Sequence, residues 1–345
     1  MITMTTEQDG AIILRINQLY HELTRDAFEA VHRHRFRVQG TFWEKVARTT
    51  LRQIRPAVQA GIAARSPSKP RAVVDLACGT GFVTRILGTR LTSNDRLIAL
   101  DLGEAPLGTT GRSWENLRQQ RRDGPALVRL AGDAQTIPLA DASADLVAMN
   151  ASLHHVPNPR KVLCEVDRIL KPGGYFALGF EPNRPHFEST LLAGAARGLA
   201  RLQWYASPRQ NRRRLRTWIG RHADDRAENE PSDWTAVADA MNAQLLREGL
   251  VDQPLRPSNI LDLIDPHARG NDEGNGFDPG QMLRQAMPGY QILLLLTSDY
   301  LGETARFCPT IRAITDAVLR TFAPGHGSLF SWLVRKPVGP PEVAP

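Results

Sequence analysis

Between residues 71 and 182, short apolar runs alternate with segments of helical length, and this alternation restricts the fold more than any other feature of the chain. The runs are rich in Val, Leu and Ile, as is typical of strands buried on both faces of a parallel sheet. The pattern predicts an α/β fold, a doubly wound sheet with right-handed crossovers. The expected strands are 72–77, 97–100, 126–130, 144–149 and 175–180, with helices around 81–91, 111–122 and 159–170.

The chain on either side of this alternation is mostly helical in pattern. Apolar residues recur at helical intervals within 11–65, in a first stretch to Val31 and a second from Phe42 to Ile54. A proline-rich linker follows at 66–70, because proline cannot continue a helix. Strand character returns only at 291–297 and 329–334, and these two runs could close the sheet as an antiparallel pair.

Composition limits the class of protein. The 345 residues include 43 Lys and Arg against 36 Asp and Glu, a net charge of +7 that raises the question of an anionic partner. The three cysteines (Cys78, Cys164 and Cys308) are too far apart for a disulfide framework or a structural zinc site, so no metal is expected. No apolar run approaches the roughly 20 residues of a membrane helix, and the polar N-terminus does not resemble a signal peptide. The expectation is a cytoplasmic protein without a membrane span.

A predicted strand that begins near residue 73 runs into a turn of small residues. The segment from Val73 to Gly81 ends at the start of a predicted helix, where the backbone can approach a ligand closely. Asp101 ends the second strand, 22 residues after Gly79, where a carboxylate would accept hydrogen bonds from both ribose hydroxyls. The G-x-G-x-x-G fingerprint is absent from this turn, which weakens a dinucleotide interpretation.

Acidic residues at the strand ends distinguish the kind of cofactor. Asp75 in the first strand would repel a pyrophosphate but would attract a cofactor that carries an ammonium and a sulfonium. Asp133, after the third strand, can accept from an exocyclic amine such as that of adenine. A lone glycine turn is more often a packing feature, and Asp75 alone could cap a helix. The combination favours S-adenosylmethionine.

Six stretches of the chain resemble the class I S-adenosylmethionine-dependent methyltransferases, in the small-molecule branch of ubiquinone/menaquinone-biosynthesis type. They are 73–81, 98–102, 132–134 with 137–139, 145–147, 153–156 and 168–174. The resemblance covers about 71–182 and implies a seven-stranded Rossmann-like sheet of order 3-2-1-4-5-7-6. It also implies S-adenosyl-L-methionine as the cofactor. Ala77 departs from the family, which often has glycine there. The implied cofactor-binding residues are Asp75, Ala77, Cys78, Gly79, Gly81, Asp101, Leu102, Asp133, Ala134 and Asn150.

The resemblance divides the chain into five parts. An N-terminal helical cap (1–70) precedes the Rossmann-like cofactor-binding core (71–182), and a helical insertion that covers the substrate follows (183–289). The final antiparallel strands (290–336) and a flexible tail (337–345) complete the chain.

Three residues are candidates for the acceptor side. His154 and His155 follow the fourth strand, and either could be a general base for a hydroxyl or an amine. Glu181, after the fifth strand, could orient a cationic or hydroxylated substrate. Each has a structural alternative, which is a backbone hydrogen bond for the histidines and a salt bridge to Arg184 or to another helix for Glu181. Asp145 is assigned to a structural role at a strand start.

The expected reaction is methyl transfer to an oxygen, nitrogen or carbon of a small organic acceptor, in specialised or cofactor biosynthesis, and the acceptor itself is not identified. The fourth strand lacks the Asn/Asp-Pro-Pro-aromatic tetrad of base-flipping enzymes, which argues against nucleic acid. The arginine excess leaves an RNA methyltransferase as an alternative, and a non-catalytic partner subunit is a third alternative.

The run from Arg209 to Arg216 could bind an anion or form a solvated helix face, and a homodimer is compatible with the sequence.

Overall fold

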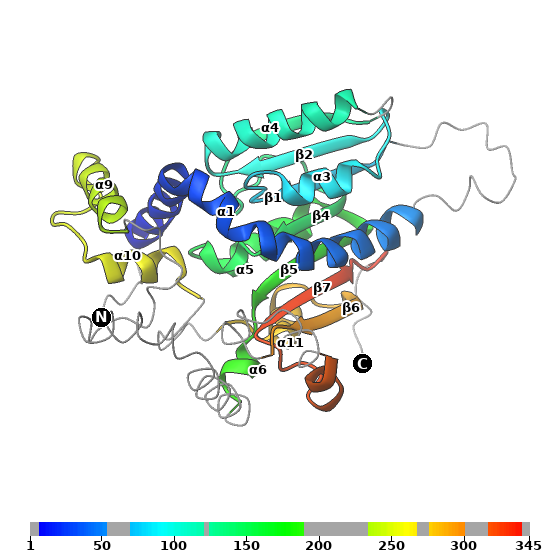
Figure 1. The fold of residues 1–345 in the computed structure, drawn as a ribbon. Coiled ribbons are helices and arrows are strands. Elements are labelled where there is room, and N and C mark those ends of the chain that lie inside the picture. The colour runs from blue at the N-terminus through cyan, green and yellow to red at the C-terminus, as the bar shows by residue number, and fades with distance from the viewer. Residues whose placement is uncertain are drawn as a thin grey trace, which may run out of the picture.

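A seven-stranded sheet of order β3-β2-β1-β4-β5-β7-β6 forms the centre of the computed structural model (Figure 1). Strands β1 to β5 pair in parallel, and β7 is antiparallel to both β5 and β6. The predicted fold class is therefore confirmed. The strands are β1 (Ala72–Leu76), β2 (Arg96–Asp101), β3 (Ala126–Ala131), β4 (Ala144–Asn150), β5 (Leu170–Pro182), β6 (Gln291–Ser298) and β7 (Leu329–Arg335).

The structure describes residues 7–53, 70–120, 124–189, 234–267, 276–300 and 317–339. The arginine run 209–216 and most of the linker 66–70 lie outside these residues. The helices are α1 (Glu7–Gln53), α3 (Phe82–Gly88), α4 (Glu104–Gln119), α5 (Pro159–Ile169), α6 (Arg184–Phe187), α9 (Trp234–Arg247), α10 (Pro257–Ile264) and α11 (Pro279–Ala286), with a short 3-10 helix η1 (Leu153–His155).

Two predicted boundaries were wrong. Helix α1 is one continuous helix of 47 residues, where the sequence suggested two stretches. Helix α4 begins at Glu104, directly after β2, several residues before the predicted start. Residues 171–174 lie within β5, where Gly173 has a φ of 78° and the register with β4 shifts. Glycine tolerates this left-handed conformation, so the strand continues through the irregularity.

Helices cover both faces of the central strands β1 and β4, which explains why these strands are apolar on both sides. Val74 and Leu76 of β1 face a cluster completed by α5 and α11. Val73, which points the opposite way, faces α3, α4 and the C-terminal half of α1. The alternation of side chains along a strand thus sends neighbouring residues of β1 into two different cores.

A third apolar cluster lies away from the sheet. Ile13, Ile16 and Leu19 from the beginning of α1 pack against α9 and α10. Figure 1 shows α9 and α10 beside this end of α1, while the rest of α1 crosses the sheet. Helix α1 therefore joins the small helical cluster to the sheet.

Polar pairs hold the amino-terminal edge of the parallel strands. Asp145 Oδ2 accepts a hydrogen bond from Ala72 N at 2.8 Å and pairs with Lys171 Nζ at 2.6 Å, so that it connects β1, β4 and β5. The guanidinium of Arg71 pairs with Asp95, and both side chains are buried. The contacts of Asp145 are structural.

Trp43 connects α1 to the sheet, and its indole provides a stability prediction. It is fully buried and its Nε1 donates to Asn150 Oδ1 at 2.8 Å. Trp43→Phe leaves that acceptor without its donor, and we expect a loss of about 1–3 kcal/mol in the free energy of unfolding, measured by urea denaturation. Trp332→Phe is the matched control, because Trp332 is equally buried but its Nε1 has no hydrogen-bond partner. An equal loss in both variants would contradict the assignment.

Candidate functional site

The carboxyl ends of the parallel strands meet at one edge of the sheet, where ligands bind in open α/β folds. Several residues with a strained, left-handed backbone conformation lie at this edge. Among the described residues, five non-glycine residues have positive φ, and four of them are at or after the ends of β1, β4, β5 and β6. These four are Ala77 (50°), Ala151 (49°), Phe180 (59°) and Asp299 (60°). Such conformations cost energy and cluster at functional sites, so this edge is the first candidate.

The two glycines of the turn after β1 are explained by different features of the structure. Gly81 has a φ of 83°, and a Cβ at this position would lie 2.8 Å from Thr110 Cγ2, so packing against α4 requires glycine. Gly79 has a φ of 53°, and a Cβ there would have no atom within 4 Å. The space beside Gly79 is therefore open to a ligand. Thr110, which sequence reasoning missed, fixes the turn because its Oγ1 donates to Gly79 O at 2.7 Å.

The other two residues of the turn contact their surroundings differently. Ala77 is partly buried at the end of β1, and its small side chain accommodates the φ of 50°. The thiol of Cys78 is buried, and its Sγ lies 3.8 Å from Thr110 Oγ1. Cys78 N donates to Leu100 O at 3.0 Å, which extends the pairing of β1 and β2 into the turn. Any contact of Cys78 with a ligand would therefore be made by its backbone.

Asp101 lies beside this turn at the end of β2. Its carboxylate accepts hydrogen bonds from Gly79 N at 2.8 Å and from Gly103 N at 3.1 Å. The side chain is 9% exposed, and burial raises the pKa of Asp101. The adjacent Leu102 is partly buried. The carboxylate thus borders the open space at Gly79 on the cofactor side predicted from the sequence.

The loop after β3 contributes Asp133 and Ala134. Asp133 accepts from Gln135 N at 2.8 Å and from Gln135 Nε2 at 2.9 Å, and Ala134 is buried. Arg168 at the end of α5 holds the continuation of the loop, since its guanidinium donates to Leu139 O at 2.7 Å and to Ile137 O at 2.8 Å. The sequence motif contained Arg168, but no role for it could be assigned without these contacts.

Asp75 is buried beneath the N-terminal turn of α3. The hydroxyl of Thr84 donates to its Oδ2, and the side chain is 1% exposed. Burial raises the pKa of Asp75 to about 7. Without a bound cation, this carboxyl group therefore holds a proton at mildly acidic pH. Thr84 was not among the predicted residues.

The raised pKa of Asp75 leads to a prediction of pH dependence. A cationic cofactor favours the ionised carboxylate, so below pH 7 binding must release the proton. We expect the affinity for S-adenosylmethionine to rise with pH up to about 7, by at most about tenfold per pH unit, and to level off above it. Calorimetric titrations from about pH 5.5 to about 8.5 measure this, with Asp75→Asn as the control whose profile is flatter. Parallel profiles for the two proteins would contradict the prediction.

Asn150, a predicted cofactor residue, uses its side chain to bind α1. Its Oδ1 accepts from Trp43 Nε1 at 2.8 Å, and its Nδ2 donates to Gln39 Oε1 at 3.2 Å. The amide therefore fixes α1 against the end of β4, close to the predicted cofactor side of the sheet.

Glu181 is fully buried at the end of β5 and binds η1. Its carboxylate accepts from Ser152 N and Leu153 N at 2.9 Å each, from His154 N at 3.1 Å and from His154 Nδ1 at 2.7 Å. Burial alone would raise the pKa of Glu181, but the charge and hydrogen bonds of His154 and the backbone N–H groups lower it. Of the two salt-bridge partners suggested for Glu181, Arg184 instead donates to Gly276 O, whereas the helical partner is found in His154 of η1.

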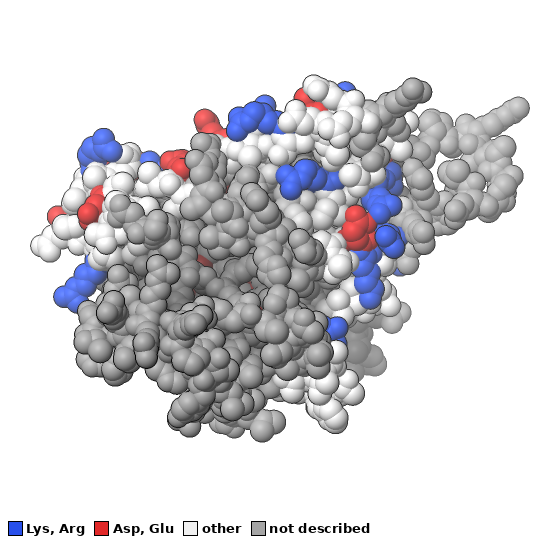
Figure 2. Space-filling view, viewed as in Figure 1, with Lys and Arg blue, Asp and Glu red and all other residues white. Residues whose placement is uncertain are grey.

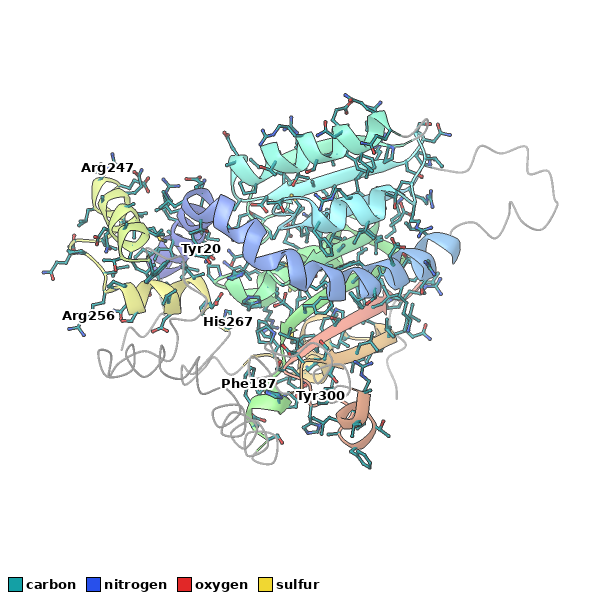
Figure 3. All side chains as sticks on the ribbon, viewed as in Figure 1. Tyr20, Phe187, Arg247, Arg256, His267 and Tyr300 are labelled. Atoms are coloured by element: carbon teal, nitrogen blue, oxygen red, sulfur yellow. The ribbon has the colours of Figure 1, made fainter. Side chains whose placement is uncertain are left out.

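His155 is held by the chain that follows α10. Its Nδ1 donates to Ile264 O at 2.7 Å and lies 2.8 Å from Asp265 Oδ1. Burial alone would lower the pKa of His155, but the charge and hydrogen bond of Asp265 raise it. His267 is nearby, with Nε2 donating to Val156 O at 3.0 Å, and Figure 3 shows it after α10. His154 and His155 therefore share one region with Asp265, which sequence reasoning missed.

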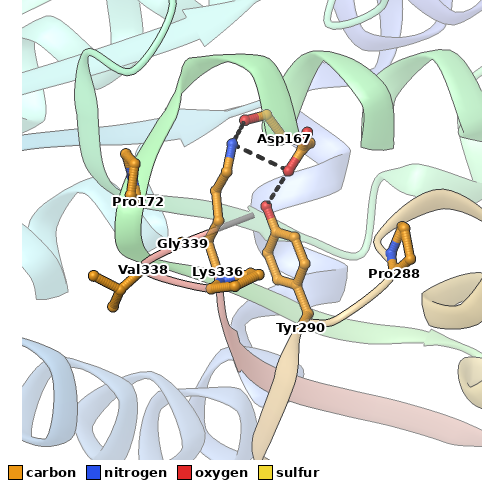
Figure 4. Close-up of a pocket in the computed structure, with 8 residues that line it drawn as sticks. Asp167, Pro172, Pro288, Tyr290, Lys336, Val338 and Gly339 are labelled. Carbon is orange, nitrogen blue, oxygen red and sulfur yellow. Dashed lines mark hydrogen bonds and ion pairs between the residues drawn. The ribbon is translucent and has the colours of Figure 1, made fainter. Parts of the chain in front are cut away.

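Two other surface features are separate from this edge. A pocket lies at the opposite edge, where β5 begins and β7 ends (Figure 4). Its polar groups already pair, since Asp167 Oδ1 accepts from Tyr290 OH at 2.7 Å and lies 3.1 Å from Lys336 Nζ. On the described part of the face in Figure 2, basic side chains are interspersed with acidic ones. Neither feature adds to the candidate site.

Comparisons with known proteins identify the sheet domain. Residues 74–178 match the sequence profile of a methyltransferase domain. A 2-phytyl-1,4-naphtoquinone methyltransferase from Thermosynechococcus vestitus is 33% identical over 105 residues, which cover 30% of this chain and 44% of that protein. A phthiotriol/phenolphthiotriol dimycocerosates methyltransferase from Mycobacterium tuberculosis is 33% identical over 134 residues, 38% of this chain and 46% of that protein. The matched segment spans less than half the length of both relatives.

A solved S-adenosylmethionine-dependent methyltransferase from Aquifex aeolicus aligns with 77% of this chain and 83% of that chain, at a TM-score of 0.35 and 14% identity. The profile match and the strand order together define residues 74–178 as a class I S-adenosylmethionine-dependent methyltransferase domain. The resemblance and the cofactor inferred from the sequence are confirmed. Among the described residues, no helix is both long and apolar enough to cross a membrane.

Proposed function

We propose that the protein transfers a methyl group from S-adenosylmethionine to a small organic acceptor. The open space beside Gly79, bordered by the carboxylate of Asp101, carries the proposal, because a ligand can approach the backbone there while its ribose hydroxyls meet an acceptor group. The relatives support an organic acceptor that is not a nucleic acid, since their names specify a 2-phytyl-1,4-naphtoquinone and phthiotriol/phenolphthiotriol dimycocerosates.

The residues around that space fit the cofactor. Asp101 would bind the ribose, the loop at Asp133 and Ala134 would bind the adenine, and the negative charge of Asp75 would balance the cation. Bound S-adenosylmethionine would supply a methyl group for an in-line displacement. The buried Asp75 can lose its proton to meet a cation, as its pKa of about 7 indicates.

The acceptor would approach from the side of η1. Glu181 holds His154 through Nδ1, so that the lone pair of His154 is on Nε2. This nitrogen is placed to take a proton from a hydroxyl or an amine, or to bind a group that does so. Glu181 acts as a positioning residue, because its oxygens are already used by η1.

The test is incubation of the protein with S-adenosylmethionine carrying a labelled methyl group and a panel of acceptors. The panel contains quinols, hydroxylated lipids, small amines and an RNA pool, and mass spectrometry detects products heavier by one methyl group. We expect transfer to a small organic acceptor. Transfer to RNA alone would support the RNA methyltransferase alternative. Cofactor binding without turnover of any acceptor would support the partner-subunit alternative, and absence of cofactor binding would refute all catalytic versions.

A further inference from the structure

Two histidines of η1 and a carboxylate from the end of α10 face one another. One ligand atom each from His154, His155 and Asp265 lie within 4.8 Å of one another. Asp265 Oδ1 is 2.8 Å from His155 Nδ1 and 3.8 Å from His154 Nε2. Nitrogen and oxygen ligands of tetrahedral Zn²⁺ are separated by roughly 3.3 Å, given bonds of about 2.0–2.2 Å. The two distances bracket this separation, and we propose that these three residues bind a divalent transition metal such as Zn²⁺.

The buried carboxylate of Glu181 gives His154 the orientation of a metal ligand. Histidines that bind metals donate their other ring N–H to a carboxylate or a backbone carbonyl, which fixes the tautomer. His154 Nδ1 is 2.7 Å from Glu181 Oε2, and Glu181 is in turn held by three backbone N–H groups. His154 therefore presents Nε2 to the ion, and this nitrogen lies 3.8 Å from Asp265 Oδ1.

His155 and Asp265 share the position that the ion would take. The proton on His155 Nδ1 lies between Ile264 O and Asp265 Oδ1, and a metal ion would replace it. The rings of His155 and His154 are close neighbours, with centroids 4.1 Å apart and planes inclined at 41°, so both lie beside the position that the ion would take. His21 approaches the other edge of the His155 ring, at 6.2 Å between centroids.

The ligand set and its exposure indicate the class of metal. Two imidazoles with one carboxylate suit Zn²⁺, Co²⁺ or Ni²⁺, whereas Mg²⁺ and Ca²⁺ prefer sites built from oxygen. The Asp265 side chain is 46% exposed, but the atom that would bind the ion, Oδ1, is buried beside the two histidines. Three protein ligands leave a fourth position open, which an oxygen of water or of a small molecule can fill. The site does not depend on methyl transfer, although its open position would face the acceptor side.

The test uses the full chain, stripped of metal by a chelator and without an affinity tag. Calorimetric titration with Zn²⁺ alone should give one equivalent per chain, and Co²⁺ should give the intense visible absorption of a tetrahedral site. Asp265→Asn and His155→Gln should each weaken Zn²⁺ binding by more than about 100-fold, and Glu181→Gln by about 10–100-fold, because it removes the group that orients His154. Circular dichroism and thermal melting establish that each variant is folded.

His186→Gln is the matched control, because His186 also bonds a backbone carbonyl, His326 O at 2.9 Å, but is outside the cluster. Its Zn²⁺ affinity should equal that of the wild type. The proposal is refuted if the wild type binds no stoichiometric Zn²⁺, or if folded Asp265→Asn and His155→Gln bind it as tightly as His186→Gln does. Asp265 is half-exposed at a helix end, so its substitution is the variant expected to fold without difficulty.

Discussion

Replacing Asp101 by alanine should abolish detectable binding of S-adenosylmethionine while the protein stays folded. The carboxylate would bind two ribose hydroxyls, and hydrogen bonds to a charged group contribute about 1.5–3 kcal/mol each. A total of about 3–6 kcal/mol corresponds to a loss of roughly 100-fold to 10,000-fold in affinity, since about 1.4 kcal/mol is tenfold. The loss of its bonds to Gly79 N and Gly103 N would loosen the turn further. Calorimetry measures the affinity.

The fold should survive this substitution, because Asp101 is not a stabilising charge. Burial raises its pKa, which means that the folded protein disfavours the ionised form. Thermal melting of Asp101→Ala should therefore remain cooperative. Glu115→Ala is the control, since Glu115 is an exposed acid on α4, with 52% of its side chain accessible. Binding by Asp101→Ala as tight as that of Glu115→Ala would refute the ribose assignment.

The sequence predicted the sheet well because its signal is local. Seven apolar runs became seven strands, and Asp101 lies at the end of β2 where the pattern placed it. A strand buried on both faces must be apolar throughout, so a run of such residues between turn signals indicates it without any tertiary information. The helix boundaries were less certain, since nothing local in α1 separates one long helix from two shorter ones.

The side-chain pairings of the candidate site could not be predicted in the same way. Asp265 meets His155 only because α10 packs against the beginning of α1, and this packing joins segments that are far apart in the chain. Glu181 was predicted to orient a substrate, yet its oxygens bind the backbone and a ring of η1. The residue type indicated a functional carboxylate, but its partners depend on the tertiary fold.

Glu181→Gln should impair methyl transfer far more than cofactor binding. The two carboxylate oxygens of Glu181 accept four hydrogen bonds, from Ser152 N and Leu153 N on one side and from His154 N and Nδ1 on the other. A glutamine amide supplies only one oxygen, so its NH₂ group would face the N–H donors on one side. The His154 ring then loses the acceptor that fixes its tautomer, whether Nε2 meets the acceptor molecule directly or through a metal ion.

A correctly placed proton-transfer group contributes about 100-fold to 10,000-fold to a rate, and we expect kcat to fall within that range. The affinity for S-adenosylmethionine should change by no more than about threefold, because Glu181 belongs to the acceptor side. Nitrogen NMR of His154 gives a second readout, since the Nδ1-protonated tautomer of the wild type should be lost in the variant. Asp167→Asn, at the opposite edge of the sheet, is the control. Wild-type kcat together with an unchanged His154 tautomer in Glu181→Gln would show that the carboxylate does not position this ring.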